Sequence, residues 1–235
     1  MSTLLLRLAA PMQAWGASAK FNQRETQRLP TKSGVVGLLA AALGRRRDES
    51  LEDLNTLIMG VRADQEGELL RDFQTVQTQT NPYVTNRYYL CDAVFVVGLQ
   101  GDSALLSRID EALKRPFFPL FLGRRSCPPV GRVSLGIRQG LSVSEALSSE
   151  PWQASVWYQK QNQGLTRLTL LLEAPPGSPG TFFLRDAPIS FSQARRQHGF
   201  RSLRAGSIQV PRLDTWLGAH GVDETAHDAF MVWEG

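Results

Sequence analysis

Hydrophobic residues occur along this chain in short runs that alternate with polar segments containing glycine and proline, a pattern typical of a mixed α/β protein. Residues 3–9 form an apolar, turn-bounded run that predicts a buried strand. Residues 31–43 predict a helix whose N-cap is Thr31 or Ser33 and which ends before Gly44. The chain therefore begins with a strand followed by a helix.

A long polar segment follows. Ser50 predicts the cap of a second, short helix, and residues 60–64 begin another strand. Residues 66–87 are rich in Gln, Thr and Asn and contain no core-forming run. Because long polar excursions from a compact domain are usually functional, we expect an arm here, a β-hairpin with its tip near residues 81–82. Residues 88–99 are aromatic and β-branched and predict one buried strand.

The following segments complete a recognisable order of elements. Residues 102–115 predict a helix capped by Asp102, residues 122–129 a loop, and residues 130–137 a strand. The order β-α-β-arm-β-α-β is that of the split βαβ arrangement. We therefore predict an α+β fold, with a ferredoxin-like (RRM-like) βαββαβ domain over residues 1–140 that carries a β-hairpin insertion.

The pattern changes after residue 140. Two strands are predicted at residues 166–173 and 181–185, joined by a turn rich in proline and glycine. Residues 141–212 are accordingly expected to form a small β-rich extension. Residues 213–235 carry five acidic and no basic side chains, and we interpret them as an acidic tail.

Composition excludes several classes of protein. The chain has 235 residues, of which 42% are hydrophobic, so it can bury a core and is neither disordered nor fibrous. Its longest apolar stretch, residues 34–43, is too short to span a membrane. No basic residue precedes the first apolar run, which favours a buried strand over a signal peptide. Cys91 and Cys127 fit neither a disulfide scaffold nor a zinc site, and we expect free thiols in the cytoplasm.

The charges are unevenly distributed. Of 26 basic residues 22 are Arg, whose planar guanidinium pairs bidentately with phosphate; genomic base composition is the alternative explanation for this ratio. Residues 118–212 contain 12 basic and 4 acidic side chains. This stretch is a candidate anion-binding surface for a polyphosphate partner.

Two short segments combine glycine with cationic side chains. Residues 31–34 offer free N–H groups, a hydroxyl and the Lys32 cation at a helix start, which is typical of an anion site and equally of an ordinary cap. Residues 123–126 place Arg124 and Arg125 beside a glycine, which favours phosphate contact over a solvated turn. Aromatic residues near basic ones could stack on bases, namely Trp15, Phe21, Tyr83, Tyr88 and Phe200.

No catalytic or metal-binding pattern stands out. His198 lies among arginines, where a phosphate-contacting or exposed residue is favoured over a general base. His220 and His227 lie in the acidic tail, where loose spacing favours a solvated segment over a metal site. We predict no cofactor, no metal and no catalytic residue.

Four blocks of sequence resemble a known family, in its order and spacing: LLLRLAAPMQAWG, PTKSGVVGLLAAALG, YLCDAVFVV and FLGRRSCP. They are similar to the CasD family, RAMP-superfamily subunits of the type I-E CRISPR surveillance complex Cascade. The resemblance covers residues 4–206. It implies an RRM-like domain with a β-hairpin thumb at about residues 68–89, a glycine-rich RAMP loop at residues 123–126, and a handle-facing helix start at residues 32–34.

The resemblance also implies a function in antiviral surveillance of DNA. Such a subunit grips the 5′ handle of the crRNA and caps the backbone filament, and its thumb packs against the adjacent backbone subunit. The implied partners are the crRNA handle, that backbone subunit, the Cascade large subunit and, indirectly, target DNA, with no membrane. The residues expected to bind RNA are Gln13, Trp15, Arg24, Arg28, Lys32, Ser33, Gly34, Arg87, Gly123, Arg124, Arg125, Ser126, Arg195, Arg196 and Arg201.

Two alternatives remain open. The chain could be a metal-independent endoribonuclease that processes CRISPR repeat RNA, using His198 with Lys32 or Tyr83. The related type I-C subunit cleaves with a Tyr, Lys and His set, but here Lys114 is followed by Arg115 rather than His. The chain could also be a protein-only scaffold whose basic surface meets acidic partners.

Overall fold

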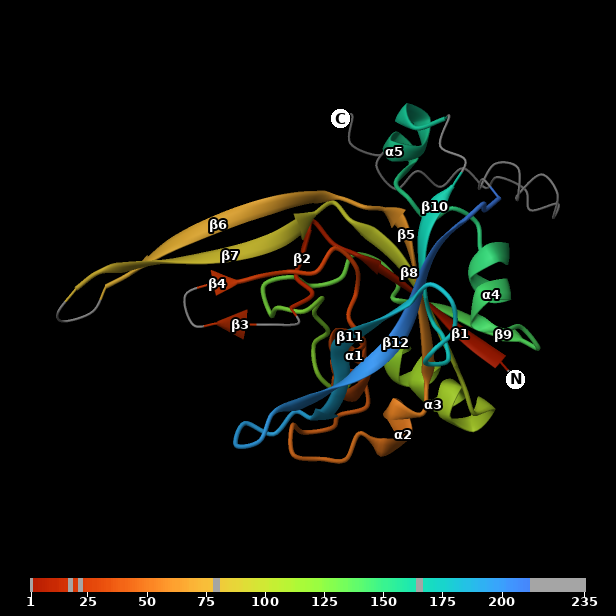
Figure 1. Cartoon of the computed structure of the whole chain (residues 1–235), viewed down its shortest axis with the longest axis horizontal. Helices are drawn as coiled ribbons and strands as arrows, with labels where there is room; N and C mark the ends of the chain where they lie inside the picture. Colours follow the sequence, from red (N-terminus) through yellow and green to blue (C-terminus); the bar gives the residue numbers. More distant parts are fainter. Residues whose placement is uncertain (1, 17–18, 21–22, 78–80, 164–166, 212–235) are drawn as a thin grey trace, which may run out of the picture.

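The computed structural model describes residues 2–16, 19–20, 23–77, 81–163 and 167–211, and its centre is a seven-stranded sheet (Figure 1). The strands run in the order β11-β12-β10-β5-β8-β1-β9, and every neighbouring pair is antiparallel. Their bounds are β1 (Ser2–Ala9), β5 (Ile58–Gln65), β8 (Val94–Gly101), β9 (Ser134–Gln139), β10 (Leu168–Glu173), β11 (Thr181–Ser190) and β12 (Gln197–Ile208).

Helices cover both faces of this sheet. Their bounds are α1 (Lys32–Ala42), α2 (Glu52–Asn55), α3 (Ser103–Lys114), α4 (Val143–Ser149) and α5 (Val156–Gln161). Strand β1 shows how the faces are separated, because successive side chains of a strand point to opposite sides. Leu4 and Leu6 join the main core with α1 and α3, whereas Leu5 packs with Val143 and Leu147 of α4. Burying each leucine stabilises the fold by roughly 1.5–3 kcal/mol.

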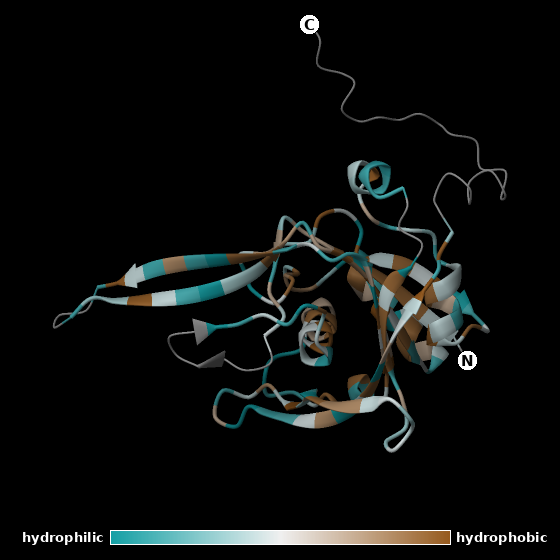
Figure 2. Ribbon diagram, turned by 45° about the horizontal axis from the view of Figure 1, so that its top comes forward, coloured by the Kyte–Doolittle hydropathy of each residue, from teal (hydrophilic) through white to brown (hydrophobic). Residues whose placement is uncertain are grey.

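A second, smaller sheet carries the arm. Its strands are β2 (Met12–Gln13), β3 (Ala19–Lys20), β4 (Gln23–Arg24), β6 (Glu68–Val76) and β7 (Tyr83–Cys91). Strand β6 pairs with β7 along its whole length, and β2 and β4 pair with different parts of β7, at residues 90–91 and 86–87. The predicted hairpin arm is thus confirmed, and Figure 1 shows it extending away from the central sheet. In Figure 2 polar and apolar residues alternate along the arm, while apolar residues concentrate in the sheet and in α1.

Other sequence predictions are confirmed or corrected. Helix α3 begins as predicted, with the Asp102 carboxylate accepting from the Leu105 amide at 3.0 Å. The single strand predicted at residues 88–99 is wrong, because the chain turns at Asp92, where φ is 54°, and forms β7 and β8 instead. Strand β9 starts at Ser134 rather than at residue 130. The N-cap of α2 is Leu51, not Ser50.

The C-terminal strands extend the central sheet. Strand β10 pairs with β5, so β10, β12 and β11 continue the sheet beyond the first four strands. The acidic tail predicted for residues 213–235 lies outside the described residues. Within the described ranges no helix is long and apolar enough to cross a membrane.

Candidate nucleic-acid interface

The glycine-rich loop at residues 123–126, with the residues that flank it, packs directly against the N-terminal segment at the base of the arm. The Ala14 amide donates to the Leu122 carbonyl at 3.1 Å, and the Cys127 amide closes the loop by donating to the Arg124 carbonyl at 2.9 Å. Gly123 has a φ of +82°, and a Cβ there would lie 1.6 Å from the Ala14 carbonyl oxygen. Only glycine fits where loop and segment meet, because both the left-handed backbone and the contact exclude a side chain.

The loop brings Arg124 over the arm's own sheet. Its guanidinium lies 4.4 Å from the centroid of the Tyr89 ring, and its Nη2 donates to the Arg24 carbonyl at 2.8 Å. Strands β4 and β7 pair in parallel with Arg24 opposite Arg87. Tyr89 is two residues beyond Arg87 and therefore shares its face of the sheet. Arg24, Arg87 and Arg124, which we call the arginine cluster, thus come together from three separate segments.

The charge of the arginine cluster is not balanced within the described part of the chain. Arg87 Nε and Arg124 Nη1 are shielded from solvent and have no hydrogen-bond partner there. Asp72, opposite Arg87 on β6, instead accepts from Gln74 Nε2 at 3.2 Å. Leaving a buried donor unpaired costs roughly 1–3 kcal/mol, and more for a charged group. An anion placed between these side chains would recover that free energy.

Gln13 and Trp15, two predicted RNA contacts, lie in the interior, with 0% and 1% of their surface exposed. Gln13 Nε2 donates to the Ala93 carbonyl at 2.6 Å, and Trp15 Nε1 donates to Gln13 Oε1 at 3.1 Å. The Trp15 ring lies over α1, where a Cβ on Gly34 would approach it to 2.7 Å. Gln13, Trp15 and Gly34 therefore hold the segment against which the glycine-rich loop packs, and the two side chains have no free surface for RNA.

The predicted anion site at the start of α1 is occupied by the chain itself. The Lys32 amide donates to Asp186 Oδ2 at 2.8 Å. Lys32 Nζ lies 3.0 Å from Glu173, and Arg201 contacts Asp186 at 2.6 Å and Glu173 at 3.1 Å. We call these four residues the ion network. Two cations and two anions neutralise one another in it, so it offers no charge to an external phosphate.

This arrangement revises the sequence-based list of RNA contacts. Lys32, Ser33 and Arg201 are each more than nine-tenths buried, so their side chains are not placed to meet RNA. By contrast, the side chains of Arg24, Arg28, Arg125, Ser126, Arg195 and Arg196 are exposed. Arg195 and Arg196 lie at the turn between β11 and β12, which Figure 1 places well away from the base of the arm.

Sequence reasoning missed Tyr89 and Asp186. Tyr89 was assigned to a core strand, although its i, i+2 spacing from Arg87 places it on the same face as that arginine. Asp186 accepts a hydrogen bond from the Lys32 amide at the start of α1, although 154 residues separate the two in the sequence. No local pattern indicates such a partner.

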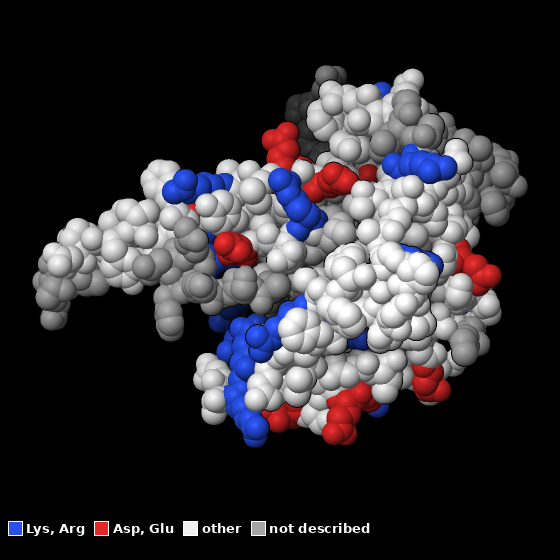
Figure 3. Space-filling view, in the orientation of Figure 1, with Lys and Arg blue, Asp and Glu red and all other residues white. Residues whose placement is uncertain are grey.

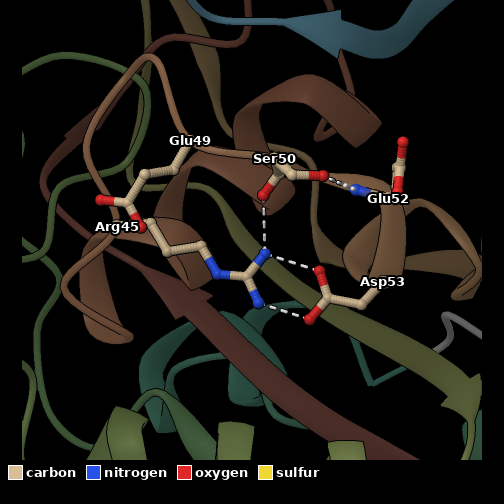
Figure 4. Close-up of a pocket in the computed structure, with 5 residues that line it drawn as sticks. All are labelled: Arg45, Glu49, Ser50, Glu52 and Asp53. Carbon is tan, nitrogen blue, oxygen red and sulfur yellow. Dashed lines mark hydrogen bonds and ion pairs between the residues drawn. The ribbon is translucent and has the colours of Figure 1, made fainter.

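A shallow surface pocket near α2 is a weaker candidate. It is lined by Arg45, Glu49, Ser50, Glu52 and Asp53 (Figure 4). Both terminal nitrogens of Arg45 donate to the Asp53 carboxylate, and these hydrogen bonds hold the pKa of Asp53 below its usual value. Arg45 is therefore already paired. No group of three His, Cys, Asp or Glu side chains suited to a metal occurs among the described residues, and His220 and His227 lie outside them.

Comparison with known proteins now defines the class. The model of the family described as CRISPR-associated protein (Cas_Cas5) matches residues 3–204, so the chain belongs to this family. Among curated proteins it is 36% identical over 190 residues to the CRISPR system Cascade subunit CasD of Escherichia coli (strain K12), covering 69% of this chain and 84% of that one.

Solved structures agree with this assignment. A chain of a CRISPR RNA-guided surveillance complex matches with a TM-score of 0.74 at 33% identity, covering 89% of this chain and 91% of its own length. A structure titled as a Cas protein matches with a TM-score of 0.72 at 40% identity, covering 89% and 98%. The fold and the sequence therefore point to the same family.

Proposed function

We propose that this chain is a non-catalytic crRNA-binding subunit of a type I-E Cascade, which grips the 5′ handle of the crRNA and caps the backbone filament in antiviral surveillance. The arginine cluster carries the proposal. Its three arginines come from β4, β7 and the glycine-rich loop, and none of them forms an ion pair with a described carboxylate. Guanidinium groups bind phosphate in a planar, bidentate geometry, so a phosphodiester backbone suits this site.

The topology supports a ferredoxin-like class for the core. The elements β1-α1-β5-β8-α3-β9 follow the βαββαβ order, and their strands lie in the order β5-β8-β1-β9. Strand β8 lies between β1 and β5 and is antiparallel to both, as a split βαβ unit requires. The arm is inserted between β5 and β8, in the position of the thumb.

The surface of the arm supports a role in contacting the adjacent backbone subunit. Large apolar side chains on both of its strands are between 41% and 72% exposed, namely Leu69, Leu70, Phe73, Tyr83 and Val84. An exposed apolar surface of this kind is typical of a protein–protein contact. The large subunit and, indirectly, target DNA are the further partners of the assembly we propose, and the cytoplasm is its compartment.

Replacing Arg124 tests the proposal. We expect Arg124→Ala to weaken binding of a labelled 5′-handle RNA by about 10- to 100-fold, because a charge-assisted hydrogen bond contributes roughly 1.5–3 kcal/mol. The slope of log affinity against log salt should also fall by about 0.7 per lost phosphate contact. Arg115→Ala, an exposed position at the end of α3, removes the same charge as a control. Equal retention of crRNA by both variants in the purified assembly would refute the proposal.

The nuclease alternative has a direct test. His198 is half-buried, and its carbonyl accepts from Arg185 Nε at 3.2 Å, but no described contact joins its imidazole to a second proton-transfer group. Incubation of the purified chain with repeat RNA in EDTA should leave the RNA intact. A site-specific cut under these conditions would replace the proposed function with the endoribonuclease.

A further inference from the structure

The outer strands of the central sheet carry two exposed phenylalanines on one face. Register pairs Phe183 of β11 with Ser202 of β12, and Phe200 is two residues from Ser202 on the same strand. Because side chains of paired residues and of i, i+2 neighbours share a face, Phe183 and Phe200 project from the same side. Phe183 is 61% exposed and Phe200 is 67% exposed.

Arginine side chains accompany these rings. The Arg185 guanidinium lies 6.0 Å from the centroid of the Phe200 ring, and its Nε donates to the His198 carbonyl, which fixes it along the strand. Arg204 is exposed further along β12, and Arg195 and Arg196 are exposed at the β11–β12 turn. Figure 3 shows Lys and Arg side chains gathered at the lower left, over the region of this turn.

Within residues 167–211 the positive charge of this face is not cancelled by carboxylates. Residues 167–211 contain two carboxylates, Glu173 and Asp186, and both belong to the ion network with Lys32 and Arg201. The remaining arginines of this segment are exposed and have no ion pair with any described residue. Burial, and after it the positive charges of Arg196 and Arg185, lower the pKa of His198, which is consistent with a positive field at the surface.

We propose that the face formed by Phe183, Phe200 and Arg185, with Arg195, Arg196 and Arg204 around it, binds single-stranded nucleic acid by stacking bases on the two phenyl rings. Exposed rings beside unpaired cations are the combination that single-strand binding requires, because the rings accept any base and the cations follow the phosphates. This inference goes beyond the proposed function, since it does not depend on the arginine cluster. The two carboxylates of residues 167–211 are already paired with Lys32 and Arg201, so the exposed arginines of this segment remain available to phosphates.

The test uses the full chain and two labelled homopolymers, oligouridylate and oligothymidylate, with binding followed by fluorescence anisotropy. Loss of one stacking ring weakens binding by about 5- to 150-fold, so we expect Phe183→Ala with Phe200→Ala to weaken binding at least about tenfold. Phe183→Tyr with Phe200→Tyr keeps both rings and should bind as the parent does. Phe117→Ala removes a 72% exposed phenylalanine elsewhere and serves as the matched control.

Each outcome is decisive. Weaker binding of both polymers by the alanine pair, at an unchanged melting temperature, supports a general single-strand site, and weaker binding of the RNA alone supports a site for the guide strand. Unchanged affinity of the alanine pair for both polymers overturns the inference. If that variant also loses a protein subunit from the assembly, the face binds protein and the inference is equally overturned. That failure would leave the role of Arg124 intact, because Arg124 is tested by retention of crRNA.

Discussion

Gly123 offers the sharpest test of how the candidate site is built. In Gly123→Ala the new Cβ would lie 1.6 Å from the Ala14 carbonyl oxygen, so loop and segment must separate. Three costs add up: about 1–2 kcal/mol for a left-handed alanine, about 1–3 kcal/mol for overpacking, and about 0.5–1.5 kcal/mol for the hydrogen bond between Ala14 and Leu122. We expect a total loss of unfolding free energy of about 3–6 kcal/mol.

Gly177→Ala separates the backbone cost from the contact cost. Gly177 has nearly the same φ, +84°, but nothing lies within 4 Å of its Cβ position. Thermal unfolding of the full chain, followed by circular dichroism, should show a decrease in Tm for Gly123→Ala at least twice that for Gly177→Ala. Handle-RNA binding should fall only in Gly123→Ala, because Arg124 is displaced with the loop. Equal decreases in Tm for the two variants would refute the packing of the loop against Ala14.

Two further predictions concern charges elsewhere in the fold. Asp186→Asn removes the buried charge that pairs with Arg201 and accepts from the Lys32 amide, and should destabilise the chain by about 3–5 kcal/mol in denaturant unfolding; an unchanged midpoint would contradict the ion network. Because the folded state lowers the pKa of His198 below 6.5, protonation favours unfolding, so stability should decline as the pH falls through 6.5 towards the lower folded-state value. His198→Gln should remove this part of the decline, and Arg196→Ala should raise the pKa of His198 measured by NMR; a pKa above 6.5 in the parent would contradict the sign.

The elements that could be predicted from the sequence are those set by local pattern. Apolar runs and capping residues predicted β1, α1 and α3, and the long polar stretch predicted the arm. The break at Asp92 was missed because residues on both sides of it are apolar and β-forming, so hydrophobicity alone does not mark the turn.

The candidate site was predictable in part. The glycine and arginines of the loop at residues 123–126 were identified from composition, and the structure adds the contacts of Gly123 with Ala14 and of Arg124 with Tyr89. Lys32 and Arg201 were expected at the surface because both are cations near glycine or other arginines. Their burial depends on Glu173 and Asp186, whose pairing arises only when distant strands come together.

Through the ion network, the start of helix α1 depends on residues of β10, β11 and β12, which come much later in the chain. While the polypeptide is being synthesised, the amino-terminal end of α1 and Lys32 emerge long before the two carboxylates that neutralise them. Any product that stops short of Glu173 leaves the Lys32 ammonium without its carboxylate and the Lys32 amide without its acceptor, a state that costs several kcal/mol. A shortened gene product is therefore expected to be cleared by proteolysis rather than to compete with the intact subunit for its place in an assembly.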